Sequence, residues 1–286
     1  MTGTLFSFGH GYTARALSRR LAPKGWGIVG TTRDAAEKDA IRAAGAEPLV
    51  WPGEAPDLDG VTHLLISTAP TAKGDPVLAA LRDEIAARAG QFDWVGYLST
   101  TAVYGDHQGG WVDETTPATP TAERGRWRLQ AEQDWAAIPG LPLHIFRLAG
   151  IYGPGRGPFS KLKKGGLRRI IKPGQVFSRI HVEDIAQVLE ASMRRPDPGA
   201  IYNVCDDEPV PPQDVIGYAA QLQGLPLPPA VDFDTADLTP MARSFYNENK
   251  RVRNDRIKTD LGVTLKYPNY RVGLEALHAD QTLNGD

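Results

Sequence analysis

Cysteine is almost absent from this chain, since Cys205 is the only one among 286 residues. A single thiol excludes an intramolecular disulfide framework and a zinc site built on cysteines. The six histidines are scattered without the spacing of metal ligands, so we expect no metal site. No apolar run approaches the ~20 residues that cross a bilayer, and the N-terminus lacks the basic start and apolar stretch of a signal peptide. We therefore expect a cytoplasmic protein with no membrane partner.

Neither positive nor negative charge is in large excess. Lys and Arg number 32 against 34 Asp and Glu, which gives a net charge of −2. This balance argues against a protein that binds nucleic acid by neutralising phosphates. Hydrophobic residues make up 41% of the chain, enough for a sizeable core. At about 150 residues per domain, the length allows two domains or one large domain with a smaller lobe.

The chain instead has a regular alternation of short apolar runs and helical periodicity. Strands are predicted at residues 5–8, 26–31, 47–51, 61–67, 94–99 and 143–148, and helices at 13–21, 34–44, 77–89 and 122–137. Such alternation implies right-handed crossovers and a mostly parallel sheet covered by helices on both faces. The pattern predicts an α/β fold with a doubly wound parallel sheet.

After residue 150 the pattern changes to an irregular Gly/Pro loop, a basic stretch and, later, short helices among frequent prolines. A helix at 182–193 and a strand at 200–204 interrupt this region. We therefore predict a dinucleotide-binding domain at 1–150, to which 180–205 returns. Residues 151–179 and 206–286 form a small, discontinuous C-terminal substrate lobe.

A glycine-rich turn lies between the first predicted strand and the first predicted helix. Its sequence is Gly9-His10-Gly11-Tyr12-Thr13-Ala14. In this position Gly9 permits a tight turn, and Gly11 lets the backbone approach a pyrophosphate. The N–H groups and the dipole of the following helix favour the negative charge. The turn predicts a Rossmann-type dinucleotide site, and the alternative is a glycine turn without a ligand.

The end of the second strand indicates which dinucleotide is preferred. NAD sites usually place an acidic residue there to bind the ribose 2′-hydroxyl, whereas this chain has Thr31, Thr32 and Arg33 before Asp34. Arg33 can make a bidentate contact with a 2′-phosphate, and a threonine hydroxyl can donate to it. We therefore expect NADP(H) rather than NAD(H). The alternative is that Arg33 faces solvent and Asp34 caps the next helix.

Several segments together resemble the extended short-chain dehydrogenase/reductase family, also described as NAD-dependent epimerase/dehydratase proteins. These segments are 9–14, 67–70, 98–105, 146–155, 179–186 and 201–204, and they span nearly the whole chain. The turn and the resemblance assign cofactor contacts to Gly9, His10, Gly11, Tyr12, Thr13, Thr32, Arg33, Ser67, Thr68, Ala69, Pro70 and Ser99.

The resemblance also implies a catalytic set, from which this chain departs. In the family a Ser or Thr at the end of the fifth strand polarises the substrate, and here that position is Thr100, with Ser99 and Thr101 as neighbours. A Tyr and a Lys four residues apart then complete the site, but those positions hold Arg124 and Arg128. Arginine has no accessible neutral form, so it cannot replace the tyrosine in proton transfer.

Three interpretations of this departure stay open. In the first, another group moves the proton, and the candidates are Glu123, Asp106, His107, Tyr104 and Tyr152. In the second, Arg124, Arg126 and Arg128 bind an anionic substrate for a reaction that needs no tyrosine. In the third, the chain binds NADP(H) without chemistry, as a sensor or regulatory protein. The arginines also fit a solvated helix face. Family members often form dimers across this helix, so a homodimer is a further expectation.

A basic cluster follows the Gly/Pro loop. The cluster comprises Lys161, Lys163, Lys164, Arg168, Arg169 and Lys172. We interpret it as a solvated lobe surface or as a cleft wall that attracts phosphate or carboxylate groups, rather than as a nucleic-acid patch. His181 precedes a helix and is expected to be structural rather than catalytic.

Overall fold

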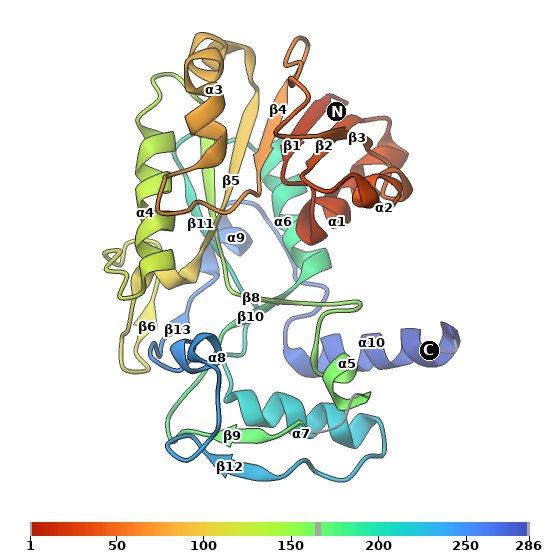
Figure 1. Ribbon diagram of the computed structural model, residues 1–286, viewed down its shortest axis with the longest axis vertical. Coiled ribbons are helices and arrows are strands. Elements are labelled where there is room, and N and C mark those ends of the chain that lie inside the picture. The colour runs from red at the N-terminus through yellow and green to blue at the C-terminus, as the bar shows by residue number, and fades with distance from the viewer. Residues whose placement is uncertain (1, 164–166, 285–286) are drawn as a thin grey trace.

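The computed structural model describes residues 2–163 and 167–284, and a seven-stranded parallel sheet lies at its centre (Figure 1). The strand order is β11-β7-β5-β4-β1-β2-β3. The strands are β1 (Thr4–Phe8), β2 (Gly27–Thr32), β3 (Glu47–Val50), β4 (His63–Ile66), β5 (Trp94–Thr100), β7 (Leu143–Leu148) and β11 (Ile201–Val204). All six neighbouring pairs are parallel. The predicted strands are therefore confirmed, each within a few residues.

Helices cover both faces of the sheet. They are α1 (Tyr12–Leu21), α2 (Lys38–Ala43), α3 (Pro76–Ala87), α4 (Glu123–Ala136) and α6 (Val182–Arg194). Along β5, Leu98 packs in one buried cluster with Leu17 of α1, whereas Tyr97 packs in another with Trp135 of α4. Successive strand residues point to opposite faces, so each face supplies its own core. This arrangement confirms the predicted Rossmann-type, doubly wound sheet.

Short 3₁₀ helices account for most differences from the predicted helices. They are η1 (Ala22–Lys24), η2 (Ala35–Glu37), η3 (Ala89–Gln91) and η4 (Thr101–Tyr104). The predicted helix at 34–44 is wrong in its first turn, which is η2, and α2 begins only at Lys38. The Asp34 carboxylate accepts from Ala36 N at 2.9 Å, and this short cap accompanies the tighter turn.

A smaller group of elements packs beside the sheet, in the lower half of Figure 1. It contains α5 (Pro158–Lys163), α7 (Pro212–Leu222), α8 (Pro240–Ser244), α10 (Tyr270–Asn284), β9 (Arg169–Ile171) and β12 (Ala230–Asp232). Its apolar core includes Phe159, Val215, Ala219 and Leu274. We refer to this group as the lobe.

Two strand pairs and one helix join the lobe to the sheet. They are β8 (Gly150–Tyr152) with β10 (Arg179–His181), β6 (Trp111–Val112) with β13 (Arg251–Val252), and α9 (Asp255–Thr259). Ile257 and Leu261 lie in the same buried cluster as Leu17 of α1. The range 206–286, assigned to the lobe from the sequence, thus contains a stretch that packs on the sheet.

The strand order places a crevice beside the end of β1. β1 lies between β2 and β4, and the crossovers from these strands run on opposite faces of the sheet. Ligands of open α/β sheets bind outside the carboxyl ends of the strands at such a switch point. The glycine turn at 9–14 follows β1 at this point. No helix in the described part of the chain is long and apolar enough to span a membrane.

Candidate functional site

The glycine turn is held tightly by its neighbours. Gly9 has a φ of +77°, and a Cβ there would lie 3.0 Å from Thr68 N and 3.2 Å from Ser67 C. Gly9 N donates to Thr31 Oγ1 at 2.8 Å, and His10 N donates to Thr31 O at 2.7 Å. Both the backbone conformation and the close approach of β4 therefore require glycine at this position.

The first turn of α1 presents unpaired donors. Arg15 N donates to Gly11 O at 2.9 Å, whereas the N–H groups at positions 12–14 have no acceptor among the residues that the structure describes. A Cβ on Gly11 would meet no atom closer than Gly9 O, at 3.9 Å. The space beside Gly11 is therefore open. Free N–H groups at the positive end of a helix dipole are suited to an anion such as a phosphate.

The His10 side chain lies beneath this turn and supports it. It is 2% exposed, its Nε2 is 3.0 Å from Ser18 Oγ, and a Cβ on Gly30 would come within 2.4 Å of its ring. Burial, together with the positive charge of Arg15, lowers the pKa of His10 to about 4. The imidazole is therefore neutral, and any ligand contact at this position falls to the backbone.

Arg33 and Asp34, which follow β2, have different roles in the structure. The Asp34 carboxylate caps the following turn, as the sequence alternative predicted, and Asp34 N donates to Thr32 Oγ1 at 3.1 Å. Arg33 is exposed and has no hydrogen bond or ion pair within residues 2–163 and 167–284. Thr32 Oγ1 in turn donates to Asp34 O at 3.2 Å, so of the side chains at this strand end it is the Arg33 guanidinium whose donors have no partner in the described part of the chain.

The segment 67–70 borders the crevice on the side of β4. Ser67 N donates to Phe8 O at 2.9 Å, which fixes the strand end beside the glycine turn. Thr68 Oγ1 is buried and has no partner in the described part of the chain. Ala69 and Pro70 follow before α3 and are exposed or partly exposed. The structure therefore places Ser67 and Thr68 next to Gly9, and contact of 67–70 with a cofactor stays a prediction.

The two hydroxyls at the end of β5 point to opposite faces. Ser99 Oγ donates to the buried Glu132, which also accepts from Arg147 Nη2 at 2.8 Å and Nε at 3.2 Å. Thr100 Oγ1 accepts from Ala102 N at 3.2 Å, but its own O–H has no acceptor among the described residues. Thr100 therefore retains a free donor, whereas the Ser99 hydroxyl is committed to a structural network.

Arg128 binds the sheet rather than projecting freely. Its Nη1 donates to Leu98 O at 2.9 Å, to Thr68 O at 3.1 Å and to Tyr97 Oη at 3.2 Å. Its guanidinium carbon also lies 5.5 Å from the centroid of the Tyr97 ring. Arg128, which the resemblance assigns to the position of the family's lysine, thus forms a clamp between the ends of β4 and β5.

Removing this clamp should destabilise the protein. We expect Arg128→Ala to lower the free energy of unfolding by about 1–3 kcal/mol, because it leaves two strand-end carbonyls without their donor. Arg126→Ala is the matched control, since the side chain of the exposed Arg126 donates, among the described residues, only to Thr121 O just before its own helix. Urea unfolding monitored by fluorescence measures both. Equal stability of the two variants would contradict the clamp.

The three arginines of α4 do not form one anion site. Arg128 points to the strand ends and Arg126 to the helix start, whereas Arg124 is exposed with no ion pair in the described part of the chain. Arg124 is thus the one of the three whose guanidinium is uncommitted. A homodimer across this helix stays a prediction.

Most alternative proton carriers are already engaged. Tyr104 Oη donates to Asn203 at 2.8 Å, and Tyr152 Oη lies 3.5 Å from Asn269 O. Burial raises the pKa of both phenols. Asp106 accepts from two backbone N–H groups, and His107 Nε2 lies 3.1 Å from Tyr104 O. Glu123 is exposed and has no partner among the described residues.

The basic cluster at 161–172 is divided among several roles. Lys164, and the side chain of Lys163, lie outside the described residues. Arg169 Nε donates to Pro228 O at 2.8 Å, and Lys172 donates to Tyr246 O. His181 is buried, and its Nδ1 accepts from Glu183 N at 3.2 Å as a helix cap. Burial lowers the pKa of His181 to about 4, so it is neutral. This cap is the structural role that the sequence suggested.

One contact across the crevice was not predicted. Tyr12 Oη donates to Pro154 O at 2.9 Å, and the guanidinium of Arg156 lies 5.7 Å from the Tyr12 ring centroid. The loop after β8 thus covers the start of α1. These residues are separated by 142 positions, so no local pattern in the sequence could indicate the contact.

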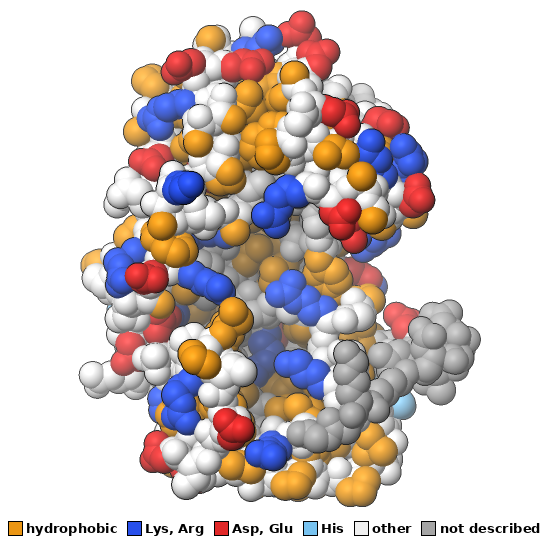
Figure 2. Space-filling view, in the orientation of Figure 1, with side chains coloured by type: hydrophobic (Ala, Val, Ile, Leu, Met, Phe, Trp, Pro, Cys, Tyr) orange, Lys and Arg blue, Asp and Glu red, His pale blue; other side chains and the backbone are white. Residues whose placement is uncertain are grey.

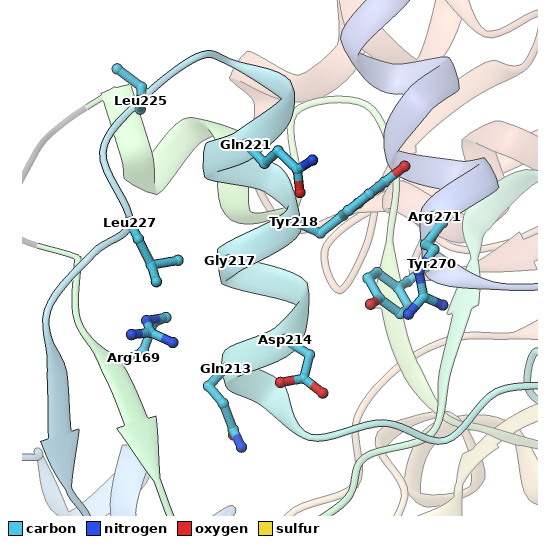
Figure 3. Close-up of a pocket in the computed structure, with 10 residues that line it drawn as sticks. All are labelled: Arg169, Gln213, Asp214, Gly217, Tyr218, Gln221, Leu225, Leu227, Tyr270 and Arg271. Atoms are coloured by element: carbon cyan, nitrogen blue, oxygen red, sulfur yellow. The ribbon is translucent and has the colours of Figure 1, made fainter.

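The surface is also hollowed near the crevice, and a further groove lies away from it. Figure 2 shows a hollow between the sheet and the lobe, with Lys and Arg side chains on both sides. A separate groove of about 760 Å³ lies on the lobe alone, along α7 (Figure 3). Its lining includes Asp214, Tyr218 and Tyr270, and none of its lining residues belongs to the glycine turn. In residues 2–163 and 167–284, no His, Cys, Asp and Glu side chains form a group of three that could hold a metal ion.

Comparisons with known proteins agree with this fold. Protein YeeZ of Escherichia coli K12 is 30% identical over 276 residues, which cover 91% of this chain and 94% of that protein. A functionally unknown conserved protein from Silicibacter pomeroyi is 83% identical, with a TM-score of 0.96 over 97% of this chain and 99% of that one. The dTDP-glucose 4,6-dehydratase of Bacillus anthracis, solved with NAD, has a TM-score of 0.78 at 15% identity, over 99% of this chain and 97% of that one. No family model matches the chain.

Proposed function

Because this chain belongs to the extended short-chain dehydrogenase/reductase family, also described as NAD-dependent epimerase/dehydratase proteins, we propose that it binds a nicotinamide dinucleotide. We propose further that the dinucleotide is NADP(H) and that the substrate is small and anionic or sugar-derived. The protein is an atypical member, since Arg124 and Arg128 stand where the family has its Tyr and Lys.

One observation carries the proposal. The N–H groups at positions 12–14 have no acceptor in the described part of the chain, and the space beside Gly11 is open. A cofactor diphosphate fits both features, because it needs donors at a helix N-terminus and close backbone approach. Arg33 would hold the 2′-phosphate of NADP(H), and Thr32 would donate to it in place of its bond to Asp34 O. Residues 67–70 would line the opposite wall of the crevice.

The cofactor, when bound, would supply a hydride acceptor or donor at its nicotinamide. The chain's own contribution begins at Thr100, whose free O–H would donate to a substrate oxygen. Arg124 would place a fixed positive charge at the start of α4. Glu123, with no partner among the described residues, is our choice for the carboxylate that accepts a proton. The start of α4 lies close to η4, which follows Thr100, because a Cβ on Gly125 would lie 3.0 Å from Ala102 O.

A second candidate function is a catalytically silent NADP(H)-binding sensor. The observation that favours it is the Arg128 clamp, which occupies the position of the family's lysine without freeing a group for chemistry. A panel of sugar-derived and carboxylate substrates, followed at the nicotinamide absorbance band, separates the two functions. Turnover that falls in Thr100→Val supports the enzyme. A blank panel with NADPH binding retained supports the sensor.

Gly11→Val tests the diphosphate site directly. Gly11 has an ordinary negative φ of −88° and open space at its Cβ, so the variant should fold with wild-type stability. Its side chain would fill the space of the diphosphate, so we expect NADPH affinity to fall by about 100-fold or more. Thermal unfolding and calorimetric titration measure the two effects.

Gly9→Ala is the contrasting control. The positive φ of Gly9 and its closeness to Thr68 N predict that Gly9→Ala loses folding stability, in contrast to Gly11→Val. A Gly11→Val protein that binds NADPH as the wild type does would contradict the proposed site.

A further inference from the structure

The Arg15 side chain joins the glycine turn to the segment that follows β2. Arg15 belongs to α1, and its Nε donates to His10 O at 3.2 Å. Its Nη2 donates to the carboxylate of Glu37 in η2 and forms an ion pair with it. Its Nη1 has no partner in the described part of the chain. The guanidinium therefore links α1 to the η2–α2 segment, which lies next to it in Figure 1.

The two segments that Arg15 joins border the expected position of the adenosine ribose. The glycine turn is tied to the end of β2, because His10 N donates to Thr31 O at 2.7 Å. In a Rossmann site the 2′-group of this ribose is recognised by residues that follow the second strand. Arg33 and Glu37 both follow β2. The Arg15 guanidinium thus lies between the turn that would bind the diphosphate and the segment that would bind the 2′-group.

The ion pair of Arg15 and Glu37 is open to solvent on both sides. The side chain of Arg15 is 24% exposed and that of Glu37 is 47% exposed. Ion pairs with this much access to water contribute little to folding stability, because water screens the attraction. A phosphate monoester carries up to about two negative charges near pH 7 and three acceptor oxygens, and it can bind a guanidinium through two hydrogen bonds. A phosphate can therefore displace the Glu37 carboxylate from Arg15.

We propose that Arg15 is a second cation, besides Arg33, for the 2′-phosphate of NADP(H), and that Glu37 takes the place of this phosphate in the free protein. The inference deepens the proposed function and rests on it. Glu37 competes with the phosphate for Arg15 and also repels it, so it lowers the affinity for NADPH. It has no such effect on NADH, whose 2′-hydroxyl is uncharged. Arg15 and Glu37 are then residues that determine specificity between the two coenzymes.

A carboxylate after the second strand has an opposite role in NAD sites, where it accepts from the ribose 2′-hydroxyl. The structure favours the first role, because Glu37 Oε2 is already engaged by Arg15. The two roles predict different effects of Glu37→Gln. Loss of a competitor raises the affinity for NADPH, whereas loss of a hydroxyl acceptor lowers the affinity for NADH.

Arg15→Gln tests the cation. We expect it to lower the affinity for NADPH by about tenfold and the affinity for NADH by less than about twofold. Both coenzymes are needed, because Arg15 also supports the turn through His10 O, and loss of that support would weaken both equally. Arg15→Lys keeps the charge and should lose less NADPH affinity. Arg19→Gln removes an exposed arginine one turn further along α1 and should leave the ratio of the two affinities unchanged.

Glu37→Gln tests the competitor. We expect it to raise the affinity for NADPH by about threefold or more and to leave the affinity for NADH unchanged. In the Arg15→Gln background this gain should be at least about twofold smaller, because the competition for Arg15 is gone and only the repulsion remains. Glu47→Gln is the matched control. It removes an exposed acid at the start of β3, at the opposite edge of the sheet, and should bind both coenzymes as the wild type does.

Calorimetric titration of the full chain at constant ionic strength measures all these affinities. A wild-type ratio of NADPH to NADH affinity in Arg15→Gln would overturn the inference and leave the dinucleotide site intact. A fall in NADH affinity in Glu37→Gln, with NADPH affinity unchanged, would also overturn it, since an acceptor for the 2′-hydroxyl gives that result. A wild-type chain that binds neither coenzyme would contradict the proposed function, and this inference with it.

Discussion

Replacing Arg33 by aspartate should lower the affinity for NADPH by about 100-fold while changing the affinity for NADH by less than about threefold. The exposed guanidinium has no partner among the described residues, so the 2′-phosphate would be its main ionic contact. A carboxylate there would repel that phosphate, whereas the 2′-hydroxyl of NADH can donate to it. Calorimetric titration with each coenzyme gives both affinities.

Arg82→Asp provides the same change of charge on α3, outside the crevice, and should leave the ratio of the two affinities unchanged. Equal weakening of NADPH and NADH binding by Arg33→Asp would indicate a non-specific effect. Unchanged NADPH binding would reject the assignment of Arg33 to the 2′-phosphate.

Glu132→Gln should cost about 3–5 kcal/mol of folding stability, the second large effect that we expect. Glu132 and Arg147 are 3% and 4% exposed and share two hydrogen bonds, and the guanidinium of Arg147 also lies 4.8 Å from the Tyr104 ring centroid. Removal of the carboxylate charge leaves Arg147 buried and unpaired. Denaturant unfolding at pH 7 measures the loss.

The double variant Glu132→Leu with Arg147→Met removes both charges and should recover much of this stability, because an apolar pair needs no counter-charge. A loss below about 1 kcal/mol in Glu132→Gln would contradict the importance of the pair. A double variant as unstable as Glu132→Gln would show that the loss comes from packing rather than from the unpaired charge.

The sequence predicted the sheet well because the signals for it are local. Each strand of the sheet is a short apolar run, and each crossover helix has apolar residues at spacings of three and four. The glycine turn between β1 and α1 is likewise contiguous in the sequence. The cap by Asp34 followed from neighbouring residues, although the 3₁₀ geometry of the turn did not.

The short strand pairs could not be predicted in the same way. β6 pairs with β13, and β9 pairs with β12, across long stretches of chain, and each of these strands has only two or three residues. Such lengths carry no periodicity that a sequence pattern can detect. Their pairing depends on how the lobe packs against the sheet.

The candidate site was predictable in its positions but not in its side-chain roles. Ser99 and Thr100 are adjacent, yet only the alternation of β5 places one in a buried network and leaves the other with a free donor. Arg128 occupies the position that the resemblance assigned, but its partners come from two other strand ends.

Calorimetric titration of the wild-type chain with NADPH and with NADH tests the proposed dinucleotide site most directly. We predict binding of one NADPH per chain, with a clearly weaker affinity for NADH. Absence of binding heat for both coenzymes at several temperatures, together with no thermal stabilisation by either, would contradict the assignment of the glycine turn as a dinucleotide site.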